Sequence, residues 1–196
     1  MASSGRFLVI HHVQVWLIEA IRLHSPVAGM MRTAWGWPIA ESVHFIGLSL
    51  LIGSIGAFDL RLLGVMKQVP IAAMHRFIPW GIGGFVLNIC SGLLFLLTEP
   101  DQYVLNASFH LKLLFLTIAG INAGTFYLTS WRTVFGATDV YEAPRRAKVI
   151  AAISLSAWVA VIICGRMLTF FRPFECEPNT TEIILTCTPE ELGRSR

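Results

Sequence analysis

The chain has 196 residues, of which 55% are hydrophobic and only 14% charged, and its mean hydropathy is +0.64. Soluble domains carry about 25% charged residues, so this composition excludes an ordinary water-soluble enzyme. The net charge of +3 is too small to indicate a nucleic-acid partner. Basic residues in so apolar a chain are expected in cytoplasmic loops, beside a lipid bilayer.

An amphipathic segment comes first in the chain, at residues 7–23. At 100° per residue its polar side chains fall in one quadrant (His11, His12, Glu19, Arg22) and its apolar ones face away (Val9, Val13, Trp16, Leu17, Ala20). Glu19 and the paired histidines interrupt the apolar stretch that a signal peptide requires. We therefore expect a helix in the membrane interface, with a fifth membrane span as the alternative.

Four apolar runs follow, each near the roughly 20 helical residues that cross a bilayer core. They cover residues 38–63, 80–97, 109–130 and 149–171. Pro38 suits a first helical turn, and Asn106 or Ser108 can cap the third run. Residues 70–77 predict a short interfacial helix that Pro79 separates from the second span.

These runs predict an all-α fold, an integral membrane up-down four-helix bundle with an N-terminal amphipathic interfacial helix. We divide the chain into an N-terminal helix and linker (1–36), the four-helix domain (37–172) and a C-terminal tail (173–196).

The charges of the loops predict the orientation. The loops after the first and third spans are basic (Arg61, Lys67, Arg76; Arg132, Arg145, Arg146, Lys148), whereas residues 99–102 are acidic. Positive loops stay in the cytoplasm, so both termini should face the periplasm of a bacterial inner membrane. Cys176 and Cys187 then lie on the oxidising side, which favours a disulfide hairpin over two free thiols.

Ionisable side chains within the spans are the candidate site residues, because each is costly in hydrocarbon unless paired or functional. Those of the outer half are Glu41, His44, His110, Lys112 and Arg166. Those of the inner half are Asp59, Arg61, His75 and Arg76, for which snorkelling and mutual pairing are the expected explanation.

His44 and His110 share one level on helices that face each other diagonally in such a bundle. Two imidazoles placed in this way can fill the axial positions of a b-type haem, with Arg166 and Lys112 paired to its propionates. Four glycines give room for a flat macrocycle or, alternatively, serve close helix packing (Gly47, Gly81, Gly83, Gly84).

Two other interpretations compete with the haem hypothesis. A histidine within a span can simply hydrogen-bond a neighbouring helix, and Glu41 and Arg166 can form a buried ion pair, so that these residues only stabilise the bundle. Glu41-x-x-His44 also places two metal ligands on one helical face, and further copper ligands are available on the same side of the membrane (His11, His12, His24, Met30, Met31). No Cys-x-x-Cys-His motif occurs, which excludes a covalent c-type haem.

The stretch WPIAESVHFIG at residues 37–47, with DLRLLG at 59–64, resembles the signature of a bacterial family of small four-helix membrane proteins without a firmly assigned activity. The resemblance continues through Pro79-Trp80, Asn106 to Lys112 and Gly165-Arg166. In layout the chain is also similar to cytochrome b561-type membrane anchors and to the membrane domain of copper-resistance D proteins.

The b561-type resemblance implies one outer haem b, because His75 is the only histidine near the inner face. Electrons would pass between a periplasmic redox partner and membrane quinone, with Glu41 as the catalytic group that carries the quinone proton. The alternative is a non-redox component, either a copper or small-solute handling protein or a scaffolding subunit of a larger membrane complex, with copper or no cofactor.

Overall fold

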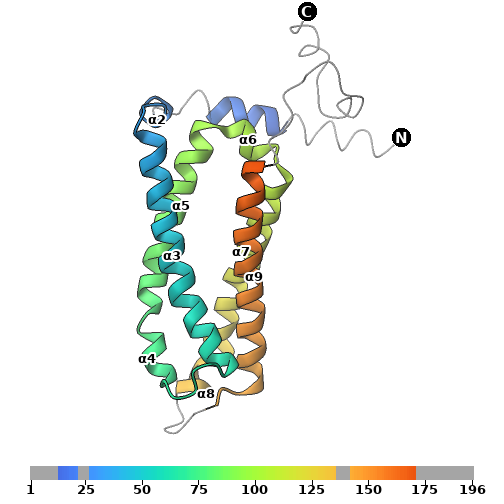
Figure 1. Cartoon of the computed structure of the whole chain (residues 1–196). Coiled ribbons are helices and arrows are strands. Elements are labelled where there is room, and N and C mark those ends of the chain that lie inside the picture. The colour runs from blue at the N-terminus through green and yellow to red at the C-terminus, as the bar shows by residue number, and fades with distance from the viewer. Residues whose placement is uncertain (1–12, 22–26, 136–141, 171–196) are drawn as a thin grey trace, which may run out of the picture.

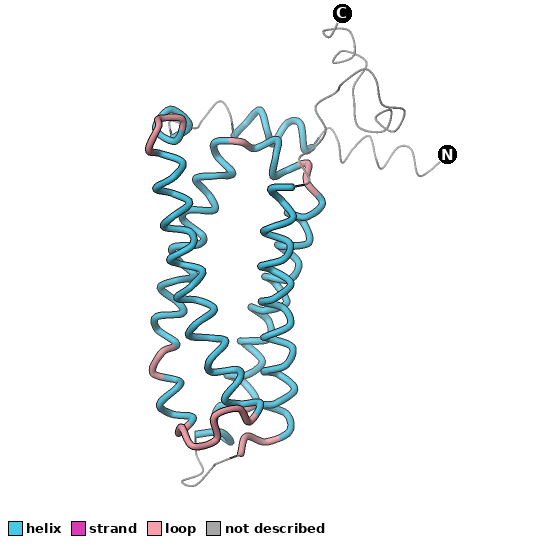
Figure 2. The backbone as a smooth tube through the Cα atoms, in the orientation of Figure 1, coloured by secondary structure: helices cyan, strands magenta, loops and turns pink. Residues whose placement is uncertain are grey.

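The computed structural model of the chain describes residues 13–21, 27–135 and 142–170, which form helices joined by short turns, with no strand in these ranges (Figures 1 and 2). The four long helices are α3 (Gly36–Leu63), α5 (Ile78–Thr98), α7 (Ala107–Thr129) and α9 (Arg145–Phe170). The short ones are α2 (Val27–Met31), α4 (Ile71–His75), α6 (Pro100–Val104) and α8 (Trp131–Phe135). The four predicted spans are therefore confirmed as helices, each long and apolar enough to cross a membrane.

The helix ends follow local sequence signals. The Asn106 side chain accepts a hydrogen bond from the backbone N–H of Ser108 at 2.9 Å, which confirms the predicted cap of α7. Pro79 lies in the first turn of α5, after the turn that ends α4, as predicted. Gly64 ends α3 with a left-handed φ of 102°, a conformation that a residue with a Cβ rarely adopts.

The bundle consists of two helix pairs. Helix α3 packs along α5, and α7 packs along α9, while α9 also contacts α3 and so joins the pairs (Figure 1). Helices α5 and α7 do not pack closely along each other. The last span thus touches both the first and the third, as the predicted four-helix bundle requires.

Two glycines form the crossing of α3 and α5. A Cβ added at Gly84 would lie 2.5 Å from the carbonyl oxygen of Gly47, and one added at Gly47 would lie 2.9 Å from the carbonyl oxygen of Gly84. A Cβ at Gly81 would come within 3.1 Å of Ile55, whereas Gly83 has open space around it. The idea that Gly47, Gly81 and Gly84 leave room for a macrocycle is wrong, because the neighbouring helix already fills the space beside each of these glycines.

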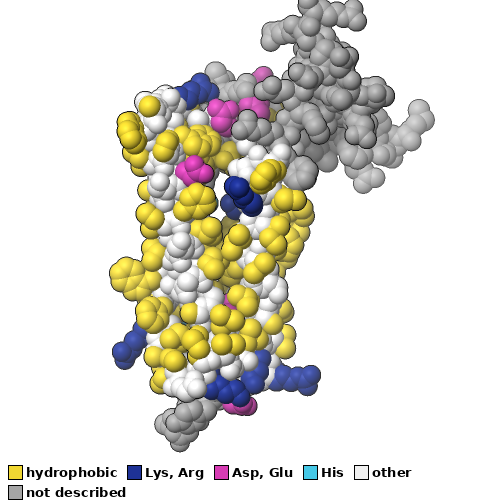
Figure 3. Space-filling view, viewed as in Figure 1, with side chains coloured by type: hydrophobic (Ala, Val, Ile, Leu, Met, Phe, Trp, Pro, Cys, Tyr) yellow, Lys and Arg dark blue, Asp and Glu magenta, His cyan; other side chains and the backbone are white. Residues whose placement is uncertain are grey.

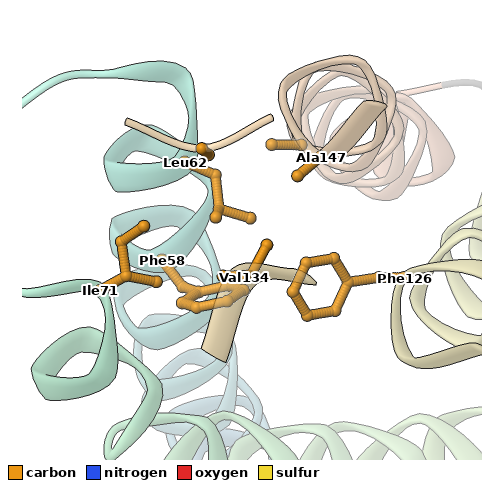
Figure 4. Packing of buried hydrophobic residues seen from close by; sticks show 8 residues of the cluster. Phe58, Leu62, Ile71, Phe126, Val134 and Ala147 are labelled. Carbon is orange, nitrogen blue, oxygen red and sulfur yellow. The ribbon is translucent and has the colours of Figure 1, made fainter. Parts of the chain in front are cut away.

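Three clusters of buried apolar side chains hold the bundle. The inner cluster, at the α4 and α8 end, draws on both helix pairs (Figure 4: Phe58, Leu62, Ile71, Phe126, Val134, Ala147). The middle cluster also joins the pairs (Leu51, Ala119, Ala157, Trp158, Val161). The outer cluster has its buried members on α2, α3 and α5 alone (Met31, Ala40, Phe95). Within the described residues, no buried apolar cluster joins the two pairs at the outer end.

The two ends of the bundle differ in charge. Lys and Arg side chains gather at the α4 and α8 end, and acidic ones lie at the α6 end (Figure 3). At the basic end Glu142 bridges Lys67 at 2.6 Å and Lys148 at 3.9 Å. The hydrogen bond from Lys67, together with the charges of both lysines, lowers the pKa of Glu142. This bridge ties the turn after α3 to the turn before α9.

Residues 13–21 are helical and lie across the α6 end of the bundle, at a steep angle to the long helices (Figure 1). Ile18 is buried, and the Gln14 side chain donates a hydrogen bond to the carbonyl oxygen of Val104 at 3.2 Å. Val13 and Trp16 are exposed on the outside. The place of this helix in the membrane interface stays a prediction.

Two inner polar residues differ from expectation. Asp59 is 5% exposed and Arg61 is 1% exposed, so neither snorkels to the interface, and they form no ion pair with each other. The Arg61 guanidinium instead donates to the backbone carbonyls of Val69 and Lys67. Arg61 therefore fastens the turn between α3 and α4 rather than neutralising Asp59.

Candidate functional site

The five outer polar residues lie where the bundle lacks a core between its two halves. Glu41 and His44 belong to the α3–α5 pair, while His110, Lys112 and Arg166 belong to the α7–α9 pair. Figure 3 shows the molecule hollowed between the pairs at this level, with Lys or Arg side chains at the hollow. Lys112 and Arg166 are the basic residues that the described spans carry in their outer half. We call this region the outer hollow.

His44 is held in one tautomer by its neighbour on α5. Its Nδ1 lies 2.8 Å from the Ser91 hydroxyl, and Ser91 donates its own proton to the Leu87 carbonyl at 2.6 Å. Because the hydroxyl proton is used there, Ser91 accepts from His44, and Nδ1 carries the imidazole proton. The Phe95 ring packs edge-to-face against the imidazole, with centroids 5.7 Å apart. The Nε2 atom of His44 therefore carries a free lone pair, as a metal-ligating histidine requires.

His110 is arranged differently. Its Nε2 lies 2.9 Å from the backbone carbonyl of Val104, so Nε2 carries the proton and Nδ1 the lone pair. The imidazole is exposed, and its nearest ring contact is with Phe109 beside it in the chain. The structure does not bring the rings of His44 and His110 into contact.

Lys112 lies on the face of α7 that packs against α9. A Cβ added at Gly165 would meet its Nζ at 3.8 Å, and its ammonium is near enough to His44 to interact with it electrostatically. The described residues offer Lys112 no hydrogen-bond or ion-pair partner. A half-buried ammonium of this kind provides a counter-charge for an anionic group in the hollow.

Arg166 and Glu41 flank the outer hollow without meeting. The Arg166 guanidinium lies over the ring of Phe170, one turn further along α9, at 5.0 Å from its centroid. Both side chains are exposed and form no ion pair, so the structural alternative of a buried Glu41–Arg166 pair is wrong. Glu41 instead lies toward α6, where burial, together with the charges of Glu41 and Glu99, raises the pKa of Tyr103 to about 12.

The side chains available as metal ligands limit the kind of metal centre that the protein can hold. In the described ranges, no three His, Cys, Asp or Glu side chains converge as they would in a protein-only metal cage. A porphyrin brings its own equatorial nitrogens, so a haem needs from the protein only axial ligands. The outer hollow offers one oriented imidazole, that of His44, and the basic side chains of Lys112 and Arg166. The further copper ligands His11, His12 and His24 lie outside the described residues, as do Cys176 and Cys187.

Two residues of functional interest were missed by the sequence analysis. Ser91 orients His44 from another helix, and only the packing of α3 on α5 shows this. Asn122 is buried within α7 and donates to the Ile150 carbonyl of α9 at 2.9 Å. An amide in the middle of an apolar span is itself a signal of a polar site, and it could have been read from the sequence.

The fold and the site define the class of this protein, a multi-pass helical membrane protein with a polar site between two helix pairs. Comparison with protein families, curated proteins and solved structures gives no match. The resemblance of residues 37–47 and 59–64 to a bacterial membrane family therefore stays a prediction.

Proposed function

We propose that the chain is a b-type haem-binding subunit that passes electrons between a periplasmic redox partner and membrane quinone. The observation that supports this most directly is the His44 imidazole, whose Nδ1–H is fixed on Ser91 so that Nε2 keeps its lone pair. The Nδ1–H hydrogen bond of a ligating histidine raises its basicity and fixes its ring orientation. A haem b bound there would supply one-electron transfer.

The other residues of the outer hollow take supporting roles. His110 would be the second residue to hold the haem, once it turns away from the Val104 carbonyl to present Nε2. Lys112 and Arg166 would neutralise the propionates. Glu41 is exposed one turn before His44, where it can hand a proton to a quinone that is being reduced at the membrane surface.

The proposed location is the bacterial inner membrane, with the α6 end of the bundle in the periplasm. The basic α4 and α8 end, where Glu142 bridges Lys67 and Lys148, then faces the cytoplasm. Reporter fusions placed after residue 68 and after residue 196 should give opposite signals, cytoplasmic for the first and periplasmic for the second. Equal signals would contradict this orientation.

A visible spectrum of the purified protein, oxidised and then reduced, tests the proposed function. Protein from haem-replete cells should show a b-type spectrum that His44→Ala abolishes and Ser91→Ala weakens, because Ser91 only orients the ligand. His75→Ala is the matched control, since His75 packs among the aromatic rings of the inner end, 4.7 Å from that of Trp131. The control should keep the wild-type spectrum.

His110→Ala separates one axial ligand from two. Loss of the spectrum, or its change from low-spin to high-spin form, would show that His110 is a ligand, whereas an unchanged spectrum would leave His44 as the only protein ligand. A colourless wild type would refute haem binding. Metal analysis of the same sample then decides the alternative, because copper lost in His44→Ala indicates copper handling and no cofactor indicates a scaffolding subunit.

A further inference from the structure

A second polar site lies in the inner half of the bundle, between the middle and the inner apolar clusters. Its side chains come from three helices: Asp59 on α3, Asn122 on α7 and Ser154 on α9. The middle cluster, with Leu51 and Trp158, lies on its outer side. The inner cluster, with Phe58, Phe126 and Ala151, lies on its other side. Asp59 is about 6 Å inside the end of α3, at 1.5 Å per residue.

Asp59 and Asn122 both bind α9 within one helical turn. The Asp59 carboxyl lies near enough to the Ser154 hydroxyl for the two to interact, and Asn122 donates to the carbonyl oxygen of Ile150, four residues before Ser154. The amide oxygen of Asn122 accepts no hydrogen bond within the described residues. Side chains that carry a carboxyl, a hydroxyl and an amide group are thus collected around one turn of α9.

The Asp59 carboxyl also has an oxygen without a hydrogen-bond partner. The Oδ2 atom of Asp59 is fully buried and receives no hydrogen bond in the described structure. A buried carboxylate oxygen left unsatisfied costs several kcal/mol in an apolar medium. An ion pair would offset this cost, yet no Lys or Arg among the described residues forms one with Asp59.

The charged and titratable groups of the surrounding elements are engaged elsewhere. On α3 itself Arg61 donates to loop carbonyls, and on α9 Lys148 pairs with Glu142. On α4 and α7 His75 lies 3.2 Å from the Tyr127 hydroxyl. Cys90, on α5, is exposed. The other basic residues of this end lie at or beyond the helix ends, where they are close to water (Arg76, Arg132, Arg145, Arg146).

We propose that Asp59 holds an exchangeable small monovalent cation, H⁺ or Na⁺, at the oxygens that Asp59, Ser154 and Asn122 gather between the two apolar clusters. Both ions bind the same kind of ligand, a carboxylate oxygen supported by neutral oxygens, as in membrane transporters and proton relays. The site is separate from the outer hollow and does not depend on a haem. It makes the inner half of the bundle a place where the protein takes up or releases positive charge.

Infrared spectroscopy of the full-length protein, grown with aspartate labelled at its carboxyl carbon, tests the proton form without any mutation. The chain has three aspartates, and Asp59 is the one within a span. A labelled carboxylic C=O band near neutral pH, which disappears reversibly at higher pH, would show an exchangeable proton. Asp59→Asn should remove that band, whereas Asp101→Asn, in the short helix α6 at the outer end of the bundle, should keep it.

Retention of radioactive sodium by the same protein in lipid nanodiscs tests the sodium form. One ion per chain, displaced by excess sodium but not by choline, and lost in Asp59→Asn, would show a sodium site. Ser154→Ala should weaken retention several-fold while the bundle stays folded. The proposal is overturned if wild-type protein shows only ionised aspartate across this pH range and retains no sodium. It is also overturned if Asp59→Asn behaves as wild type in both measurements.

Discussion

Adding a single methyl group at Gly84 should separate α3 from α5. The new Cβ would lie 2.5 Å from the Gly47 carbonyl oxygen and 2.7 Å from the Leu51 nitrogen, both backbone atoms that cannot turn aside. Ordinary contact begins at 3.4 Å, so the helices must move apart locally by roughly 1 Å. When the helices move apart by this distance, the atoms in contact at the crossing lose part of their dispersion energy.

Overpacking of this kind typically costs about 1–3 kcal/mol, which for a chain of this length lowers the melting temperature by roughly 2–12 °C. Gly83→Ala is the matched control, because the Cβ added there meets nothing within 4 Å. Gly83→Ala should raise the stability of the folded protein by up to about 1 kcal/mol, because alanine has the higher helix propensity and its methyl group makes no clash there. Thermal unfolding in one detergent should therefore rank Gly83→Ala above wild type and Gly84→Ala below it.

The same substitution should reach the outer hollow. Gly47 lies one turn after His44 on α3, and Ser91 is carried by α5, so separation of the helices lengthens the 2.8 Å hydrogen bond between His44 and Ser91. If Gly84→Ala unfolds at or above the temperature of Gly83→Ala, the close crossing of α3 and α5 is refuted. The assignment of the His44 tautomer, which depends on that crossing, would then fail with it.

Three further predictions concern the ends of the bundle. Asn106→Ala should destabilise the protein by about 1 kcal/mol in thermal unfolding, because it removes the cap on the Ser108 N–H, whereas Asn106→Asp should keep most of the stability. The bridge between Glu142 and Lys67 should be present above the usual pKa of a glutamate and be lost as the pH falls through the lowered pKa of Glu142. Hydrogen exchange in the turn before α9 should rise only when the bridge is lost. Glu142→Gln, which cannot form the bridge, should show the raised exchange at every pH. The pKa of Tyr103 is raised from 10.0 to about 12, so the stability that this residue contributes should be fully present below pH 10 and be lost between about pH 10 and 12. In an ultraviolet titration of the folded protein, Tyr103→Phe should lack the most basic tyrosinate step.

Most of the fold could be predicted from the sequence because the bilayer allows few alternatives. Runs of about 20 apolar residues must be helices, since every backbone polar group needs an internal partner in lipid. Local signals such as Asn106 and Pro79 then set the helix ends. The division into two pairs was not predictable, because the glycines that bring α3 and α5 together resemble those that face open space, such as Gly83 and Gly120.

The candidate site was predictable in its residue types but not in its contacts. Depth along each helix placed His44 and His110 at one level, with Lys112 and Arg166 in the same outer half, and this needs only the rise per residue. Which ring nitrogen carries the proton depends on partners from other elements, Ser91 for His44 and the Val104 carbonyl for His110. Distance along the chain gives no information on such partners. The burial of Asp59 was missed for the same reason, because closeness to a helix end indicates depth but not the direction in which a side chain points.

The distribution of the apolar clusters links the two proposed sites. The clusters that join the helix pairs lie in the middle and inner parts of the bundle, on either side of Asp59, whereas the outer cluster belongs to α2, α3 and α5 alone. The outer hollow is therefore bounded by two pairs that are free to adjust to a ligand between them. A group bound by His44 and Lys112 would bridge the pairs and stabilise the folded state in proportion to its affinity. The Asp59 carboxyl lies where the pairs are already joined, so the middle apolar cluster separates the proposed cation site from the outer hollow.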